Sequence, residues 1–138
     1  MRNAECGMRN QQRDIFGMRE FVDDFKVRTK QLGLRVIRLV GSLPRNPTND
    51  VIGRQLLKSA TSVGANYRAA CRARSQAEFC AKLGIVEEEA DETIYWLEVL
   101  VEAGILESNR VEDLMKEASE VLAVVVSSIN TAKGKRRS

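Results

Sequence analysis

The chain has 138 residues, of which 43% are hydrophobic and 30% charged, and this composition suits one folded domain with a single core. It contains no histidine, which removes the commonest general acid/base and most transition-metal sites, so we expect no enzyme, no cofactor and no metal. No apolar run approaches the ~20 residues that a membrane-spanning helix needs, and we expect a cytoplasmic protein without a membrane partner.

The first helix is predicted over residues 19–43, after a flexible N-terminal tail over residues 1–17 that shows no sustained apolar period. Its apolar residues recur every three or four positions, with one missed turn at Arg28 and Thr29. Pro44 should end it, and Thr48 or Asn49 should cap the next helix. The residues expected to face the core are Phe21, Phe25, Leu32, Val36, Leu39 and Leu43.

The second helix is predicted over residues 50–73, and its small residues Gly64 and Ala65 favour the close approach of another helix. Ser75 followed by Glu78 is the pattern of a capping box, in which each residue satisfies a free backbone amide at the start of a third helix. The core residues expected on the second helix are Ile52, Leu56, Ala60, Val63, Tyr67 and Ala70.

The third helix should run to about Ala103, with Gly104 as its C-cap, and the fourth should start at an Asn109 cap. Residues 122–126 are apolar on nearly every side, which calls for burial on two sides. A basic tail follows over residues 133–138. The predicted core residues are Phe79, Leu83, Val86, Ala90, Ile94, Leu97 and Val101, then Val111, Leu114, Ala118, Val121, Val125 and Ile129.

Four amphipathic helices joined by short connections predict an all-α, antiparallel up-down-up-down four-helix bundle over residues 18–132.

Charge is distributed unevenly along this bundle. Residues 21–74 carry 11 basic and three acidic side chains, whereas residues 75–132 carry three basic and 13 acidic ones. At ~100° per residue, Arg54, Lys58, Arg68 and Arg72 fall on one side of the second helix, in a basic stripe about 27 Å long. By the same geometry an acidic stripe on the third helix contains Glu87, Asp91, Glu98 and Glu102.

Three interpretations of these stripes remain open at the level of sequence. The stripes could pair within one bundle as ordinary surface ion pairs. They could instead pair between protomers, in a head-to-tail contact that closes into a ring. The arginines could also be free to bind the phosphates of RNA or DNA, and the last two interpretations are compatible.

The motif over residues 59–70, Ser-Ala-Thr-Ser-Val-Gly-Ala-Asn-Tyr-Arg-Ala-Ala, is followed by Arg72, Ser75, Glu78 and Phe79. A third-helix segment over residues 83–92 and then Trp96-Leu97-Glu98 complete the pattern. This ordered combination resembles the four-helix-bundle proteins encoded in 23S rRNA intervening sequences, over about residues 24–131. Gly64 stands where many members of that family have proline, which leaves open whether the second helix is kinked.

The resemblance implies a four-helix bundle that assembles as a homopentamer and has no known enzymatic activity. The architecture is also similar to the accessory variability determinant of diversity-generating retroelements, a pentameric basic bundle that partners a reverse transcriptase and binds nucleic acid. Among the motif residues, we expect Asn66 to hydrogen-bond a neighbouring helix or loop.

We therefore expect a homo-oligomeric, homopentameric scaffold or adaptor that binds RNA or DNA and a partner protein. The alternative is a purely protein-interaction module whose charged faces serve self-assembly. The candidate nucleic-acid-binding residues are Arg54, Lys58, Arg68, Arg72 and Arg74. The candidate oligomer-interface residues are Glu87, Asp91, Glu98 and Trp96, the last because the adjacent Tyr95 and Trp96 cannot both face one core.

Overall fold

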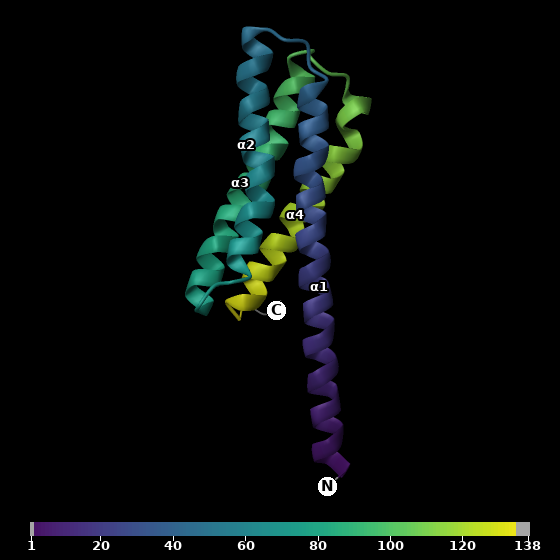
Figure 1. Cartoon of the computed structure of the whole chain (residues 1–138), viewed down its shortest axis with the longest axis vertical. Helices are drawn as coiled ribbons and strands as arrows, with labels where there is room; N and C mark the ends of the chain where they lie inside the picture. The colour runs from purple at the N-terminus through teal and green to yellow at the C-terminus, as the bar shows by residue number, and fades with distance from the viewer. Residues whose placement is uncertain (1, 135–138) are drawn as a thin grey trace.

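The structure is a computed structural model that describes the backbone of residues 2–134 and the side chains of residues 17–134. In this part of the chain four helices and no strands are present: α1 (Arg2–Gly41), α2 (Pro47–Ala70), α3 (Gln76–Glu102) and α4 (Ser108–Ala132). They form the predicted antiparallel up-down-up-down bundle (Figure 1). Each helix packs against the two helices beside it, so α1 lies diagonally across from α3 and α2 from α4. None of the described helices is both long and apolar enough to cross a membrane.

Helix α1 begins at Arg2, well before the start expected near Arg19. Its N-terminal part extends beyond the other three helices (Figure 1). The boundary predicted between a tail and the bundle at residue 18 stays a prediction, and residues 135–138 of the predicted basic tail lie outside the described residues.

The core stripe predicted on α1 is confirmed at Phe25, Leu32, Val36 and Leu43, which are buried, and it is wrong at Phe21. Phe21 is 50% exposed because it lies one turn before Phe25, whose ring meets Tyr67 in the last turn of α2. Little of α2 remains beyond that point to cover it. Thr29 fills the turn that the apolar pattern misses: it is fully buried, and its hydroxyl donates to the Phe25 carbonyl at 3.0 Å.

The connection between α1 and α2 ends earlier than predicted. Asn46, and not Thr48 or Asn49, caps α2, and its side chain accepts from the Asn49 amide at 2.8 Å. Pro47 then occupies the first helical position, where the missing N–H has no intrahelical partner to lose.

The close approach predicted at Gly64 is confirmed. A Cβ added at Gly64 would lie 3.4 Å from backbone atoms of Thr29 and Lys30 on α1. Gly33 makes the reciprocal approach from α1, where an added Cβ would lie 3.5 Å from the Thr61 Cα. Helix α2 continues through Gly64 as one element, and the two glycines allow α1 and α2 to cross backbone against backbone.

The predicted caps of α3 are both present. The Ser75 hydroxyl accepts from the Glu78 amide at 3.0 Å, and the Glu78 carboxylate reaches back to the Arg74 amide at 3.0 Å. At the other end Gly104 adopts a φ of 73°, and the amides of Gly104 and Ile105 donate to the carbonyls of Val101 and Leu100. This is the Schellman pattern that glycine favours.

The core of the second helix pair follows the predicted spacing with small shifts. Every residue predicted for the core of α4 is buried, but α4 starts after Glu107, which makes no side-chain cap, and not after Asn109. On α3 the fully buried positions include Thr93 and Leu100, whereas the predicted Ile94 and Val101 are only partly buried. The Thr93 hydroxyl meets the Ser59 hydroxyl of α2 at 3.1 Å, so this buried polar pair is satisfied.

Candidate interaction surfaces

The basic stripe of α2 is exposed along its whole length. Arg54, Lys58, Arg68 and Arg72 are all exposed, because the opposite side of the helix carries the core residues from Ile52 to Ala70. Helix α2 ends at Ala70, three residues before its predicted end, so Arg72 lies in the loop after α2 together with Arg74, which is also exposed. The ion pairs described between side chains of residues 17–134 join other groups, and none of them connects this stripe with the acidic stripe of α3. Pairing of the two stripes within one bundle is therefore not what the structure shows.

A shallow apolar groove of about 230 Å³ runs beside this stripe, where α1 crosses α2. Its floor is formed at the crossing by Gly33 and Gly64. Three cations line it, and no acidic residue does: Lys26 and Lys30 come from α1 and Arg68 from α2. The groove therefore combines apolar contact with positive charge.

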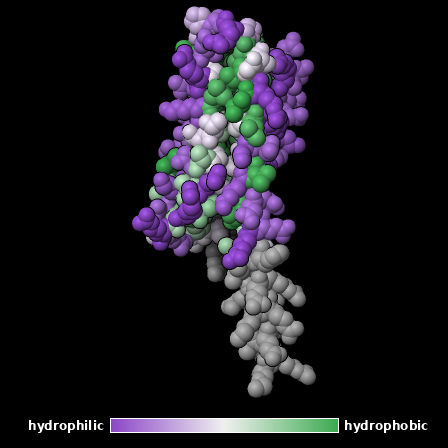
Figure 2. Space-filling model, viewed as in Figure 1, coloured by the Kyte–Doolittle hydropathy of each residue, from purple (hydrophilic) through white to green (hydrophobic). Residues whose placement is uncertain are grey.

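Helix α1 carries a second apolar stripe beside this groove, on a side that its own bundle does not cover. Val27, Leu34 and Ile37 recur at helical spacing, with Lys30 between them. Val27 is 59% exposed and Ile37 is 47% exposed. In Figure 2 a band of hydrophobic surface runs over the upper part of α1 and its border with α2, between hydrophilic margins. A helix that needs only one core uses only one apolar stripe, so this second stripe is available for contact.

The residues predicted for an oligomer interface on α3 lie at its surface to different degrees. Asp91 and Glu98 are exposed and Glu87 is half-buried. Trp96 packs partly against the core, and its indole N–H donates to the Glu92 carboxylate at 3.2 Å. The rings of Tyr95 and Trp96 meet edge to face with centroids 4.9 Å apart, and Tyr95, at 54% exposed, is the more accessible of the two.

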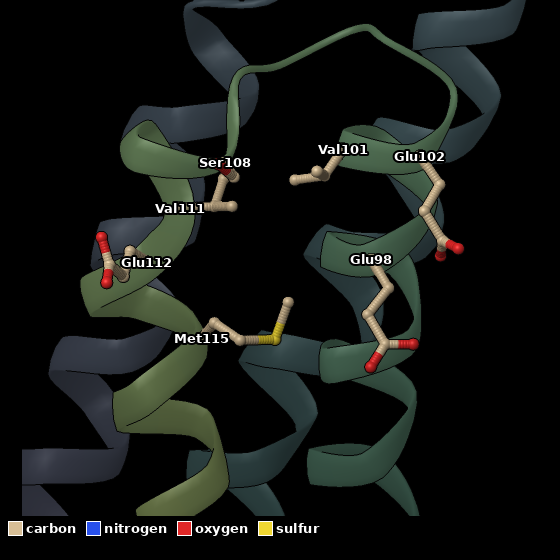
Figure 3. Close-up of a pocket in the computed structure, with 7 residues that line it drawn as sticks. All are labelled: Glu98, Val101, Glu102, Ser108, Val111, Glu112 and Met115. Carbon is tan, nitrogen blue, oxygen red and sulfur yellow. The ribbon is translucent and has the colours of Figure 1, made fainter.

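A hollow of about 580 Å³ lies between the end of α3 and the start of α4. Figure 3 shows Val101 of α3 and Val111 and Met115 of α4 pointing into the gap between the two helices. Glu98, Glu102 and Glu112 stand at its margins, and no basic residue lines it. We call this hollow, lined by Glu98, Val101, Glu102, Ser108, Val111, Glu112 and Met115, the acidic groove.

The two grooves lie on opposite sides of the bundle. One is formed by α1 and α2 and the other by α3 and α4, and the helices pack in cyclic order. One side of the molecule therefore presents apolar surface with a positive rim, and the opposite side presents apolar surface with a negative rim.

Arg28 of α1 forms ion pairs with two glutamates of α4. Its Nε lies 2.9 Å from Oε1 of Glu117, and its Nη2 lies 2.6 Å from Oε2 of Glu120. The hydrogen bond and the charge of Glu117, with a smaller contribution from Glu120, raise the pKa of Arg28 above its usual value, although partial burial opposes this. Arg28 is therefore occupied within the bundle and is not part of either groove.

Five carboxylates lie within residues 87–92 of α3. Among the described residues, no group of three or more acidic, cysteine or histidine side chains converges in a way that could hold a metal ion. Burial, with the neighbouring charge of Glu92, raises the pKa of the Glu89 carboxyl above its usual value, and Lys58 opposes this shift. Glu89 is half-buried one turn before Thr93, whose hydroxyl meets Ser59 of α2, so it lies at the border between α2 and α3.

The structure brings together residues that the sequence did not connect. Lys26 and Lys30 of α1 line one groove together with Arg68 of α2. Val101 of α3 lines the other groove together with Val111 and Met115 of α4. The sequence signal for the first group was the Val27–Leu34–Ile37 spacing on α1, out of phase with the core stripe. Asn66 was expected to bond a neighbouring helix or loop, and this was wrong: its side-chain amide donates to the Ser62 carbonyl of its own helix at 2.9 Å.

The fold and its two opposed grooves define an antiparallel four-helix bundle with segregated surface charge. The chain belongs to the 23S rRNA-intervening sequence protein family, whose sequence model matches residues 24–127. Among solved structures it is similar to a protein of unknown function from the S23 ribosomal protein family of Bacteroides thetaiotaomicron. That likeness has a TM-score of 0.72 and 33% sequence identity, and covers 76% of this chain and 97% of the other. No curated protein matches the chain significantly.

Proposed function

We propose that this protein acts by binding and not by catalysis, as a homo-oligomeric, ring-forming scaffold that binds RNA or DNA through the arginine-rich face of α2. The observation that carries this proposal is the separation of charge: the positive side chains on α2 and most of the negative ones on α3 are exposed, and no ion pair between described side chains joins the two stripes. A ring of five copies, as the family resemblance implies, would carry five such basic faces.

The chemistry of the α2 stripe suits a phosphate backbone. Arg54, Arg68 and Arg72 offer planar forks of N–H donors that match phosphate oxygens, and Lys58 adds a further charge. The part of the stripe on α2, from Arg54 to Arg68, is about 21 Å long at 1.5 Å per residue, so several successive phosphates would lie within its reach. Arg54 donates from Nε to the Asp50 carbonyl at 3.3 Å, which leaves its other N–H donors for a ligand.

The test is retention of labelled single-stranded and double-stranded RNA and DNA on filters between 50 and 200 mM salt. Four or five phosphate contacts per protomer predict an affinity that falls about 100- to 500-fold over that range, because bound counterions are released. Retention that does not change with salt, or no retention at 50 mM salt, would contradict the proposal.

A matched pair of variants locates the contact. Arg72→Gln should lower the slope of log affinity against log salt by about one, because one phosphate contact is lost. Lys116→Gln removes one exposed charge from α4 and should leave the slope unchanged. Equal slopes for the two variants would place the nucleic acid elsewhere.

A second candidate, a protein-interaction module without nucleic-acid binding, is favoured by one observation: apolar residues lie inside both charged grooves. Phosphate backbones need no apolar floor, whereas protein interfaces combine an apolar centre with a polar rim. This candidate predicts oligomers that dissociate with salt and no affinity for RNA or DNA at any salt concentration. Size exclusion with light scattering, read together with the filter assay, separates the two.

A further inference from the structure

We propose that the acidic groove between α3 and α4 is the docking site for the α1–α2 edge of a second copy of this chain, with Ile37 as the apolar residue that enters it. We call that edge, formed by Lys26, Lys30, Leu34, Ile37 and Arg68, the basic edge. The inference rests on the self-association in the proposed function and names the two surfaces that make it.

The two surfaces are complementary in charge and in polarity. The acidic groove has Val101, Val111 and Met115 in its centre and three glutamates at its margins. The basic edge has Leu34 and Ile37 in its centre and three cations at its margins. Apolar centres facing each other within surfaces of opposite charge are an arrangement that gives an interface both affinity and specificity.

The apolar parts of the two surfaces lie at similar heights on the bundle. Glu98 and Val101 lie in the last turns of α3, and Leu34 and Ile37 lie in the last two turns of α1. Since α1 and α3 run in the same direction, the acidic groove and the part of the basic edge around Ile37 lie toward the end of the bundle that carries the α1–α2 and α3–α4 loops (Figure 1), whereas Lys26 and Arg68 lie farther from that end. Copies related by rotation about an axis along the bundle meet at equal heights, so Ile37 of one copy reaches the groove of the next.

Two different surfaces on opposite sides of one chain make a head-to-tail contact. Each copy then offers one free edge and one free groove until the assembly closes on itself. A contact of one surface with its own copy would instead stop at two chains. This difference provides the test.

The test uses two full-length variants, each of which disables one surface at exposed positions. Ile37→Asp removes the apolar residue of the edge and places a negative charge opposite the glutamates. Glu98→Lys with Glu112→Lys reverses the margins of the groove. Mass is measured by light scattering on nuclease-treated protein, and circular dichroism confirms that each variant keeps its helical content.

The wild-type protein should form an assembly of more than two chains, and each variant alone should be monomeric. An equimolar mixture should form a dimer with one chain of each kind, because one intact groove then meets one intact edge. A control variant, Lys116→Glu on the exposed side of α4, should assemble as the wild type does.

Several results would overturn the inference: a monomeric wild type, folded variants that still assemble, or a mixture that stays monomeric. The groove could also bind the basic C-terminal residues of another copy. The triple variant Lys135→Ser, Arg136→Ser and Arg137→Ser tests this occupant. If it fails to assemble while Ile37→Asp assembles normally, the C-terminal residues fill the groove and the basic edge does not. Arg72→Gln should assemble normally although its salt slope for nucleic acid falls by about one. Failure of RNA or DNA binding and failure of this interface therefore give different results.

Discussion

The α1–α2 half and the α3–α4 half of the bundle bury similar cores but expose opposite charge. Both halves face the interior with leucine, valine and alanine at spacings of three and four. Residues 21–74 nevertheless carry 11 basic and three acidic side chains, against three basic and 13 acidic in residues 75–132. The core would pack equally well with positive or negative charge on the surface of either half, because surface charge affects solubility and association more than the fold. The packing of the core therefore does not account for the difference in charge.

The halves also differ in how closely their helices approach. Gly33 and Gly64 bring the backbones of α1 and α2 into contact, whereas Val101, Val111 and Met115 keep a hollow between α3 and α4. The groove on the basic side has a volume of about 230 Å³, and the acidic groove has a volume of about 580 Å³.

The largest effect is expected from a substitution that disrupts the close crossing of α1 and α2 in the basic half. Gly64→Val should lower the free energy of unfolding by about 1–3 kcal/mol, because the new side chain meets the backbone of Thr29 and Lys30, which cannot move aside. Gly84→Val is the control in the acidic half, where a Cβ meets nothing within 4 Å. Urea titration of both variants checks this, and equal losses would show that the crossing is not tight.

A smaller effect is expected from removing the ion pairs that connect α1 with α4. Arg28→Gln should lower the free energy of unfolding by about 0.5–1 kcal/mol, since it removes the ion pairs with Glu117 and Glu120 at a partly exposed site. The loss should shrink at high salt, where exposed charges are screened. Arg38→Gln, on an exposed position of the same helix, should have less effect. A loss that is equal for both variants, or independent of salt, would argue against the ion pairs.

The smallest effect concerns Glu89 at the border between the halves. Because burial raises the pKa of Glu89 in the folded state, the folded protein holds this proton more tightly than the unfolded chain does. The stabilisation from that proton is complete below the ordinary pKa of 4.5 and is lost as pH rises through the raised pKa. Glu89→Gln should therefore raise the melting temperature slightly at pH 7 and leave it nearly unchanged at pH 4. A variant less stable than the wild type at pH 7 would show that the ionised carboxylate is stabilising.

Most of the core could be predicted from the sequence because helical periodicity places residues three and four apart on one side. The prediction failed where neighbours, and not periodicity, decide burial. Phe21 is exposed because α2 ends nearby, and Leu100 is buried in place of Val101 because α3 lies between two partners. Cap positions also depend on competing residues: Asn46 caps α2 although Thr48 and Asn49 were equally good candidates.

The amino-acid sequence by itself determined the four helices, the segregation of charge and the family, since each depends on which residues follow one another. Only the tertiary structure decided which charged residues share a surface with which apolar ones. Lys30 and Arg68 meet across a helix crossing, and Glu98 and Glu112 flank one hollow, because each pair comes from two helices whose relative rotation is set by packing. Helical spacing describes one helix at a time, and a binding surface requires two.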